Sequence, residues 1–145
     1  MVAAGGLADG AHVAAVLVLG ASGAALGTRF LLTPECTYSS NQKQALLAAV
    51  DTVRTLAFDE VRSSMGWPQG VDGRALWNKT VEDKTIGRDL EERQKLFLEA
   101  TKKDDTSRSA TWAGASIGLM NEIKGAGVRV PLFKACRPVT DYSNV

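Results

Sequence analysis

Two short apolar stretches and an alanine-rich stretch alternate in the first part of the chain. Residues 2–4 (VAA) and 23–26 (GAAL) are the apolar stretches, and each is followed by glycine. The alanine-rich segment 11–19 lies between them and is followed by Gly20, a residue typical of the end of a helix. Its alanines favour a helix, although its three valines would suit a strand equally. The pattern predicts a β-α-β unit whose two parallel strands end in glycines at the same edge.

The remainder of the chain predicts mainly helices and loops. Residues 40–50 have a helical pattern, and residues 89–103 have an apolar face opposite a charged one. The segment Thr33-Pro34-Glu35 is typical of a helix start, with threonine as the N-cap and proline at the first position. Trp67 and Trp77 fall in loop-like sequence, where we expect aromatic side chains to pack rather than to contact a ligand. The predicted fold class is α/β.

Composition and charge narrow the class of protein. The 145 residues are 45% hydrophobic and 23% charged, which suits one soluble globular domain. Since 17 Lys and Arg residues nearly balance 16 Asp and Glu residues, no basic field exists to attract nucleic acid. Cys36 and Cys136 lie far apart with only His12 to assist them, so no metal site is expected. We interpret the cysteines as reduced thiols of a cytoplasmic protein.

The uncharged segment 13–27 raises the question of a leader peptide or a membrane span. A secretory signal carries its positive charge before the apolar stretch, whereas the first basic residue here, Arg29, follows it. The segment is also shorter than the roughly 20 residues that span a bilayer. We therefore expect neither a signal peptide nor a membrane segment.

The glycines of residues 16–27 (VLVLGASGAALG) invite comparison with dinucleotide-binding loops. Gly20, Gly23 and Gly27 give G-x-x-G-x-x-x-G, whereas the dinucleotide fingerprint is G-x-G-x-x-G followed directly by a helix. An NAD(P)-binding oxidoreductase of the short-chain type would require that helix after Gly27 and a strand over residues 16–19. It stays as a minor alternative.

Four stretches carry a resemblance to a known family. They are residues 3–10 (AAGGLADG), 19–35 (LGASGAALGTRFLLTPE), 52–78 (TVRTLAFDEVRSSMGWPQGVDGRALWN) and 112–124 (WAGASIGLMNEIK). In this order they resemble the end of the barrel in the nitronate monooxygenase family, formerly called 2-nitropropane dioxygenases, and its fungal-type members in particular. These are FMN-dependent flavoproteins with a TIM (β/α)₈ barrel.

The resemblance implies an organisation for the chain. Residues 1–33 would be the last β-α units of the barrel and its FMN-phosphate-binding end, and residues 34–124 a mainly helical region of the same domain. Residues 125–145 depart from the family pattern. Because a complete barrel takes about 250 residues, we expect a C-terminal fragment of a truncated barrel that lacks the first six units. The family's catalytic histidine would lie upstream, so no catalytic residue is expected here.

The resemblance also implies a cofactor site. It places the FMN phosphate between Gly6 on one side and the turn of Ala25, Leu26, Gly27 and Thr28 on the other, with main-chain N–H groups as ligands and the Thr28 hydroxyl beside them. Family members often have a polar residue where Ala25 stands. Arg29 suits either a phosphate or an internal salt bridge, since guanidinium binds both anions.

The function implied is the oxidation of alkyl nitronates by O₂ with FMN. An alternative is a catalytically inactive remnant, or an interaction module that depends on a partner. In that case the missing barrel half, or a second copy of the chain, would cover the open strand edges.

Overall fold

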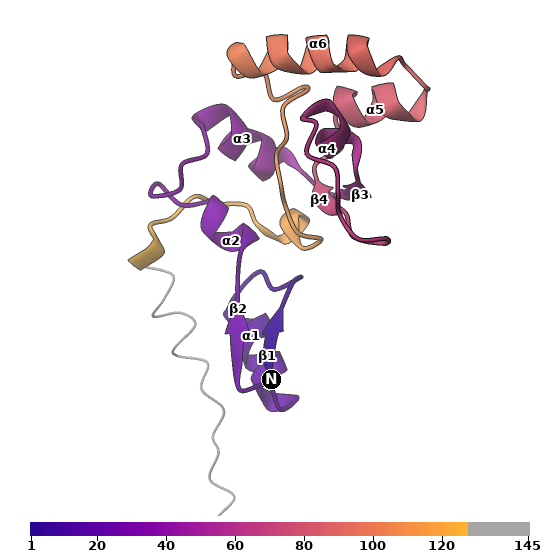
Figure 1. Cartoon of the computed structure of the whole chain (residues 1–145). Helices are drawn as coiled ribbons and strands as arrows, with labels where there is room; N and C mark the ends of the chain where they lie inside the picture. Colours follow the sequence, from indigo (N-terminus) through magenta and orange to yellow (C-terminus); the bar gives the residue numbers. More distant parts are fainter. Residues whose placement is uncertain (128–145) are drawn as a thin grey trace, which may run out of the picture.

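The structure is a computed structural model, and it describes residues 1–127. The chain begins with a parallel pair of strands, β1 (Val2–Ala4) and β2 (Gly23–Ala25), joined by helix α1 (Gly10–Val18). This unit forms one end of the molecule, below the remaining helices in Figure 1. The predicted β-α-β unit is confirmed, with α1 shifted by one residue from the expected range.

Local capping explains where α1 begins and ends. The Asp9 carboxylate accepts a hydrogen bond from the His12 N–H at 3.0 Å, which satisfies one of the free donors of the first turn. After the helix, Gly20 adopts a φ of +96°, a conformation that side chains disfavour. Since residues 16–18 are helical, no strand runs into Gly20, although a short helix (Thr28–Leu31) does follow Gly27 directly. Of the two features that a dinucleotide-binding loop would require here, the helix is present and the strand is not.

Helices dominate the second part of the chain, as predicted. Helices α3 (Ser40–Ala48) and α6 (Leu90–Lys102) lie within two residues of the expected ranges. Among residues 1–127, further helical elements are α2 (Thr28–Leu31), α4 (Ala57–Val61), α5 (Lys79–Thr85) and the 3₁₀ helix η1 (Ile117–Leu119). In Figure 1, α4, α5 and α6 gather at the end of the molecule opposite the β-α-β unit.

The expected helix start at Thr33 is wrong. The helix before it, α2, ends at Leu31, and the Thr33 hydroxyl donates back to the Phe30 carbonyl at 2.9 Å. That hydroxyl closes a turn instead of capping a following helix. The next helix begins only after Ser39, where Ser39 and Gln42 form a reciprocal capping box.

An antiparallel pair of strands lies in the region that we expect to consist of helices and loops. Strands β3 (Val53–Thr55) and β4 (Gly73–Ala75) pair antiparallel, with Arg54 opposite Arg74. Each strand has three residues, too few to show a two-residue alternation in the sequence. The expectation that residues 34–124 form mainly helices therefore misses these two strands.

Two clusters of buried apolar side chains hold the molecule together. One comprises Ala8, Leu32, Leu46, Leu76, Ala113, Ile117 and Met120, and the other comprises Ala57, Phe58, Val61, Ala75, Val81 and Phe97. The first includes Ala8 of the β-α-β unit, so this unit and the helical region share apolar packing.

Two tryptophans depart from the packing expected of them. Trp67 and Trp77 are each 56% exposed, and the indole N–H of Trp67 donates to Asp59 at 3.0 Å. The tryptophan that packs is Trp112, whose ring meets Phe58 edge to face at 5.6 Å. Within residues 1–127, no helix is long and apolar enough to cross a bilayer.

Candidate anion-binding site

The two glycine loops leave the same edge of the parallel strand pair. In the register of β1 and β2, Ala4 lies opposite Ala25, and these are the last residues of the two strands. Gly5-Gly6 continue from one strand and Leu26-Gly27 from the other. The structure therefore brings together two segments that are separated in the sequence by all of α1, as the sequence predicted (Figure 1).

The backbone of these loops is open to an approaching group. Gly5 and Gly6 have φ values of +83° and +70°, which favour glycine. A Cβ atom added at Gly6 or Gly27 would meet no atom within 4 Å. Backbone N–H groups that face such open space can bind an anion.

Thr28 is held by a residue far along the chain. The N–H of Gly114 donates to Thr28 Oγ1 at 2.7 Å, so the hydroxyl oxygen is used as an acceptor. Its own proton then remains for an acceptor outside this pair. A Cβ added at Gly114 would lie 2.9 Å from the same oxygen, so glycine at this position allows the contact.

The other predicted site residues supply main chain only. Ala25 is the last residue of β2 and is exposed, and Leu26 joins it to Gly27. Neither side chain has a polar atom. The site residues predicted from the sequence thus lie on β2, on the loops that follow β1 and β2, and at the first position of α2.

A cavity of about 360 Å³ adjoins the second glycine loop. It is lined by Gly27, Thr28, Leu31, Tyr38, Arg74, Trp112, Ala113 and Gly114. Sequence reasoning missed the contribution of β4 and of residues 112–114, because no local signal connects these segments with Gly27. Arg74 is the basic residue in this lining.

Tyr38 fixes one wall of the cavity. Its hydroxyl oxygen accepts a hydrogen bond from the Trp112 N–H at 3.1 Å. Burial raises the pKa of the phenol above its ordinary value, so Tyr38 is a neutral donor and acceptor at physiological pH.

Arg29 is buried and makes an internal ion pair. Its Nη2 lies 3.5 Å from Glu122 Oε1, while Nε and Nη1 have no hydrogen-bond partner among the described residues. The sequence left Arg29 as either a phosphate ligand or part of an internal salt bridge, and the structure shows the salt bridge. Lys124 also pairs with Glu122, at 2.7 Å.

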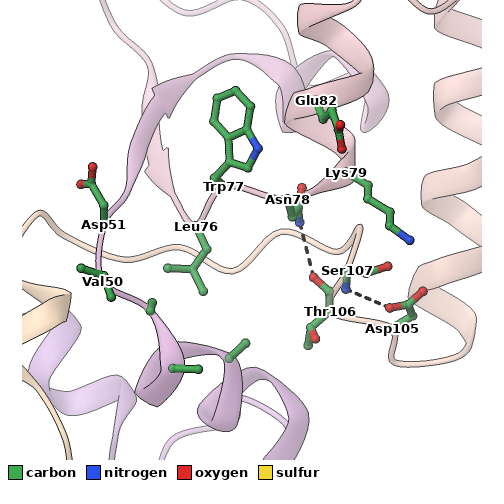
Figure 2. A pocket seen from close by; sticks show the side chains of 13 residues that line it. Val50, Asp51, Leu76, Trp77, Asn78, Lys79, Glu82, Asp105, Thr106 and Ser107 are labelled. Atoms are coloured by element: carbon green, nitrogen blue, oxygen red, sulfur yellow. Dashed lines mark hydrogen bonds between the residues drawn. The ribbon is translucent and has the colours of Figure 1, made fainter.

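A larger cavity of about 670 Å³ lies between the end of α3 and the start of α5. Figure 2 shows that several polar groups around it bond to one another: Asn78 donates to the Thr106 carbonyl at 3.5 Å, and the Ser107 N–H donates to Asp105 at 2.8 Å. The Asn78 bond holds the loop after α6 against the start of α5, and the Ser107 bond lies within that loop.

Ion pairs stabilise the helical end of the molecule. Burial opposes the ionisation of Glu60, but hydrogen bonds from Lys84 and Arg93 outweigh it and lower the pKa of Glu60. The single histidine, His12, bonds to Asp9 at 2.9 Å through Nδ1 and lies on α1. Residues 1–127 contain no group of three or more metal-ligating side chains.

Comparison with known proteins gives the class of protein. The family model described as "Nitronate monooxygenase" matches residues 1–127. A nitronate monooxygenase of Neurospora crassa is 37% identical over 131 residues, which cover 88% of this chain and 35% of the relative. Nitronate monooxygenase npaC of Metarhizium robertsii is 37% identical over 139 residues, covering 90% of this chain and 39% of the relative.

A solved structure extends the likeness to the fold. The nitroalkane oxidase of Streptomyces ansochromogenes has 32% identity and a TM-score of 0.71, covering 92% of this chain and 38% of that one. The chain belongs to the nitronate monooxygenase family, an oxidoreductase family. It spans little more than a third of the length of the two curated relatives.

Proposed function

We propose that this chain is the phosphate-binding end of an FMN-dependent enzyme that oxidises alkyl nitronates with O₂. The observation that carries the proposal is the parallel pair β1 and β2, whose glycine loops leave one edge. In (β/α)₈ barrels, a phosphate is commonly held by the loops after strands 7 and 8. In our proposal β1 and β2 are these two strands of a TIM barrel, and the protein is cytoplasmic.

The residues present fit a phosphate group. The backbone at Gly6 and Gly27 has open space where a side chain would otherwise stand, and Thr28 has a hydroxyl proton available. In the proposal, the N–H groups of Gly6 and of the turn from Ala25 through Leu26 to Thr28 hold the phosphate. When bound, the flavin would accept electrons from the nitronate.

The proposal assigns no catalytic residue to the described chain. His12 is engaged with Asp9 at the start of α1. In our proposal the base that takes the proton next to the nitro group belongs to the part of the family members that this chain does not match. The described chain contributes binding and packing.

The exposed edge of β1 favours a second candidate, a module that acts with a partner. Val2 is 62% exposed, and Val18 and Leu19 at the end of α1 are 74% and 85% exposed. Apolar side chains beside an open strand edge promote association. The occupant in this proposal is the remaining part of a barrel, or a second copy of the chain. This candidate would be contradicted if size-exclusion chromatography shows that the chain alone is a compact monomer and if that monomer unfolds cooperatively on heating.

Fluorescence titration of the full chain with FMN and with riboflavin tests the main proposal. We expect FMN to bind more tightly than riboflavin, because only FMN carries the phosphate. The substitution Gly27→Val places a branched side chain where the phosphate approaches and should weaken FMN binding by about tenfold or more, equivalent to about 1.4 kcal/mol.

The control for this titration is Ala25→Gln, which adds a polar side chain beside the same turn and should leave FMN binding unchanged or stronger. Equal binding of FMN by the parent chain and by Gly27→Val would refute the assignment of the glycine loop. Nitronate oxidation by the chain alone would refute the proposal that this chain binds the phosphate but supplies no catalytic residue.

A further inference from the structure

Arg74 is the basic residue that lines the cavity beside Gly27 and Thr28. It lies at the centre of β4, in the part of the chain that follows the β-α-β unit. Its Nη1 donates to the Thr52 carbonyl at 3.3 Å and to Thr52 Oγ1 at 3.1 Å. These two bonds hold one amino group of the guanidinium and leave its remaining donors for another acceptor.

The charge of Arg74 is not compensated by a carboxylate. Among residues 1–127 it forms no ion pair, in contrast to its cross-strand neighbour Arg54, which pairs with Asp72 at 2.6 Å. The buried Arg29 of α2 is likewise paired, with Glu122. A half-buried cation without a counter-charge next to a cavity indicates that an anion completes the site.

A chain of hydrogen bonds fixes Arg74 relative to the glycine loop. The Arg74 carbonyl accepts from the Ala113 N–H at 3.1 Å, and the next residue, Gly114, donates to Thr28 Oγ1 at 2.7 Å. The strand that carries the guanidinium is therefore attached to the threonine hydroxyl through two consecutive residues. Arg74 and Thr28 keep a fixed relation even though they lie on separate elements.

We propose that Arg74 supplies the side-chain cation for the phosphate that the Gly27–Thr28 turn binds through its main chain. This inference rests on the proposed function and adds a residue to it. A phosphate monoester carries about −1.5 to −2 charges at pH 7. Guanidinium offers it two N–H groups in a fixed fork, and these charge-assisted bonds are stronger than neutral ones.

The test uses the full chain and two probes that carry phosphate, inorganic phosphate and FMN. Riboflavin, which lacks the phosphate, is the comparison for FMN. Phosphate binding is followed by NMR shifts of the Gly27 and Thr28 amides. The substitution Arg74→Met should weaken both phosphate and FMN binding about 10- to 100-fold, the range expected for loss of a charge-assisted bond, and leave riboflavin binding unchanged. Arg74→Lys keeps the positive charge but cannot donate two parallel N–H groups, so its affinity for phosphate and FMN should lie between those of the parent and Arg74→Met.

Arg54→Met is the matched control, because Arg54 lies opposite Arg74 on the paired strand β3 and does not line the cavity. It should bind phosphate and FMN as the parent does. If Arg74→Met does not fold, the phosphate and FMN affinities of Arg74→Lys are compared with those of Arg54→Met. Weaker binding by Arg74→Lys than by Arg54→Met then supports the role of Arg74.

The outcomes separate this inference from the proposed function. FMN binding that is unchanged in both Arg74 variants overturns the role of Arg74 and leaves the proposed function standing. Phosphate binding that depends on Arg74 without any FMN binding supports the role of Arg74 and overturns the flavin proposal. If the chain binds neither probe, both are overturned.

Discussion

Thr28 accepts a hydrogen bond from the Gly114 N–H at 2.7 Å, and this contact joins the start of α2, directly after the glycine loop, to the segment before η1. The two residues are separated by 86 positions in the chain. Thr28 and Arg74 line the same cavity, and this contact holds the threonine side chain there. Residues of the proposed phosphate site therefore depend on a contact formed only in the folded chain.

We expect Gly114→Ala to disturb this contact. The added Cβ would lie 2.9 Å from Thr28 Oγ1, so the hydroxyl or the backbone must shift, at a cost of about 1–3 kcal/mol in the free energy of unfolding. Urea unfolding measures this change. Gly27→Ala is the control, because its Cβ meets no atom within 4 Å. Equal stability of Gly114→Ala and the parent would contradict the prediction.

Gly73→Ala should be more harmful, because the added Cβ would overlap the Trp112 ring. The ring packs against Phe58, so it cannot move without disturbing the second apolar cluster. We expect a loss of about 3 kcal/mol or more in unfolding free energy, at the upper end of the overpacking range. Gly23→Ala, whose Cβ would meet Val2 at an ordinary 3.9 Å, serves as the control in the same thermal denaturation measurement.

Leu46→Ala should reduce the stability of the first apolar cluster. Leu46 is 0% exposed, and truncation of such a side chain costs about 2–5 kcal/mol through lost burial and a residual cavity. Leu98→Ala is the matched control, since Leu98 is 55% exposed on α6. Similar urea midpoints for the two variants would show that the packing around Leu46 is not as described.

The stability of the helical end should depend on pH in the acid range. Burial opposes the charge of Asp83, but Arg108 and Arg88 outweigh it, so the pKa of Asp83 is lowered in the folded chain. The unfolded state then binds more protons as the pH falls, and stability is lost as the pH drops from about 4 through the lowered folded value.

Thermal unfolding between pH 7 and pH 3 measures this loss. Asp83→Asn should be less stable than the parent at pH 7 and should lose less stability on acidification. Asp51→Asn is a suitable control, because no ion pair involves Asp51 among the described residues. An identical pH profile for the parent and Asp83→Asn would exclude Asp83 as a source of the acid sensitivity.

Local sequence determined the elements whose signals lie within a few residues. The cap at Asp9 and the positive φ at Gly20 bound α1, and the apolar face of residues 90–102 specifies α6. The paired glycine loops also followed from the sequence, because a parallel β-α-β unit brings both strand ends to one edge. Gly6 and Gly27 could thus be selected before any tertiary contact was known.

Tertiary structure alone decided the rest. The strands β3 and β4 are too short to leave a periodic pattern. They pair through Val53 and Ala75, of which Ala75 belongs to the second apolar cluster and Val53 packs against it. Arg74 reaches the cavity beside Gly27 only because residues 113 and 114 connect β4 with Thr28. Such contacts depend on the packing of segments far apart in the chain, and no local pattern of residues encodes that packing.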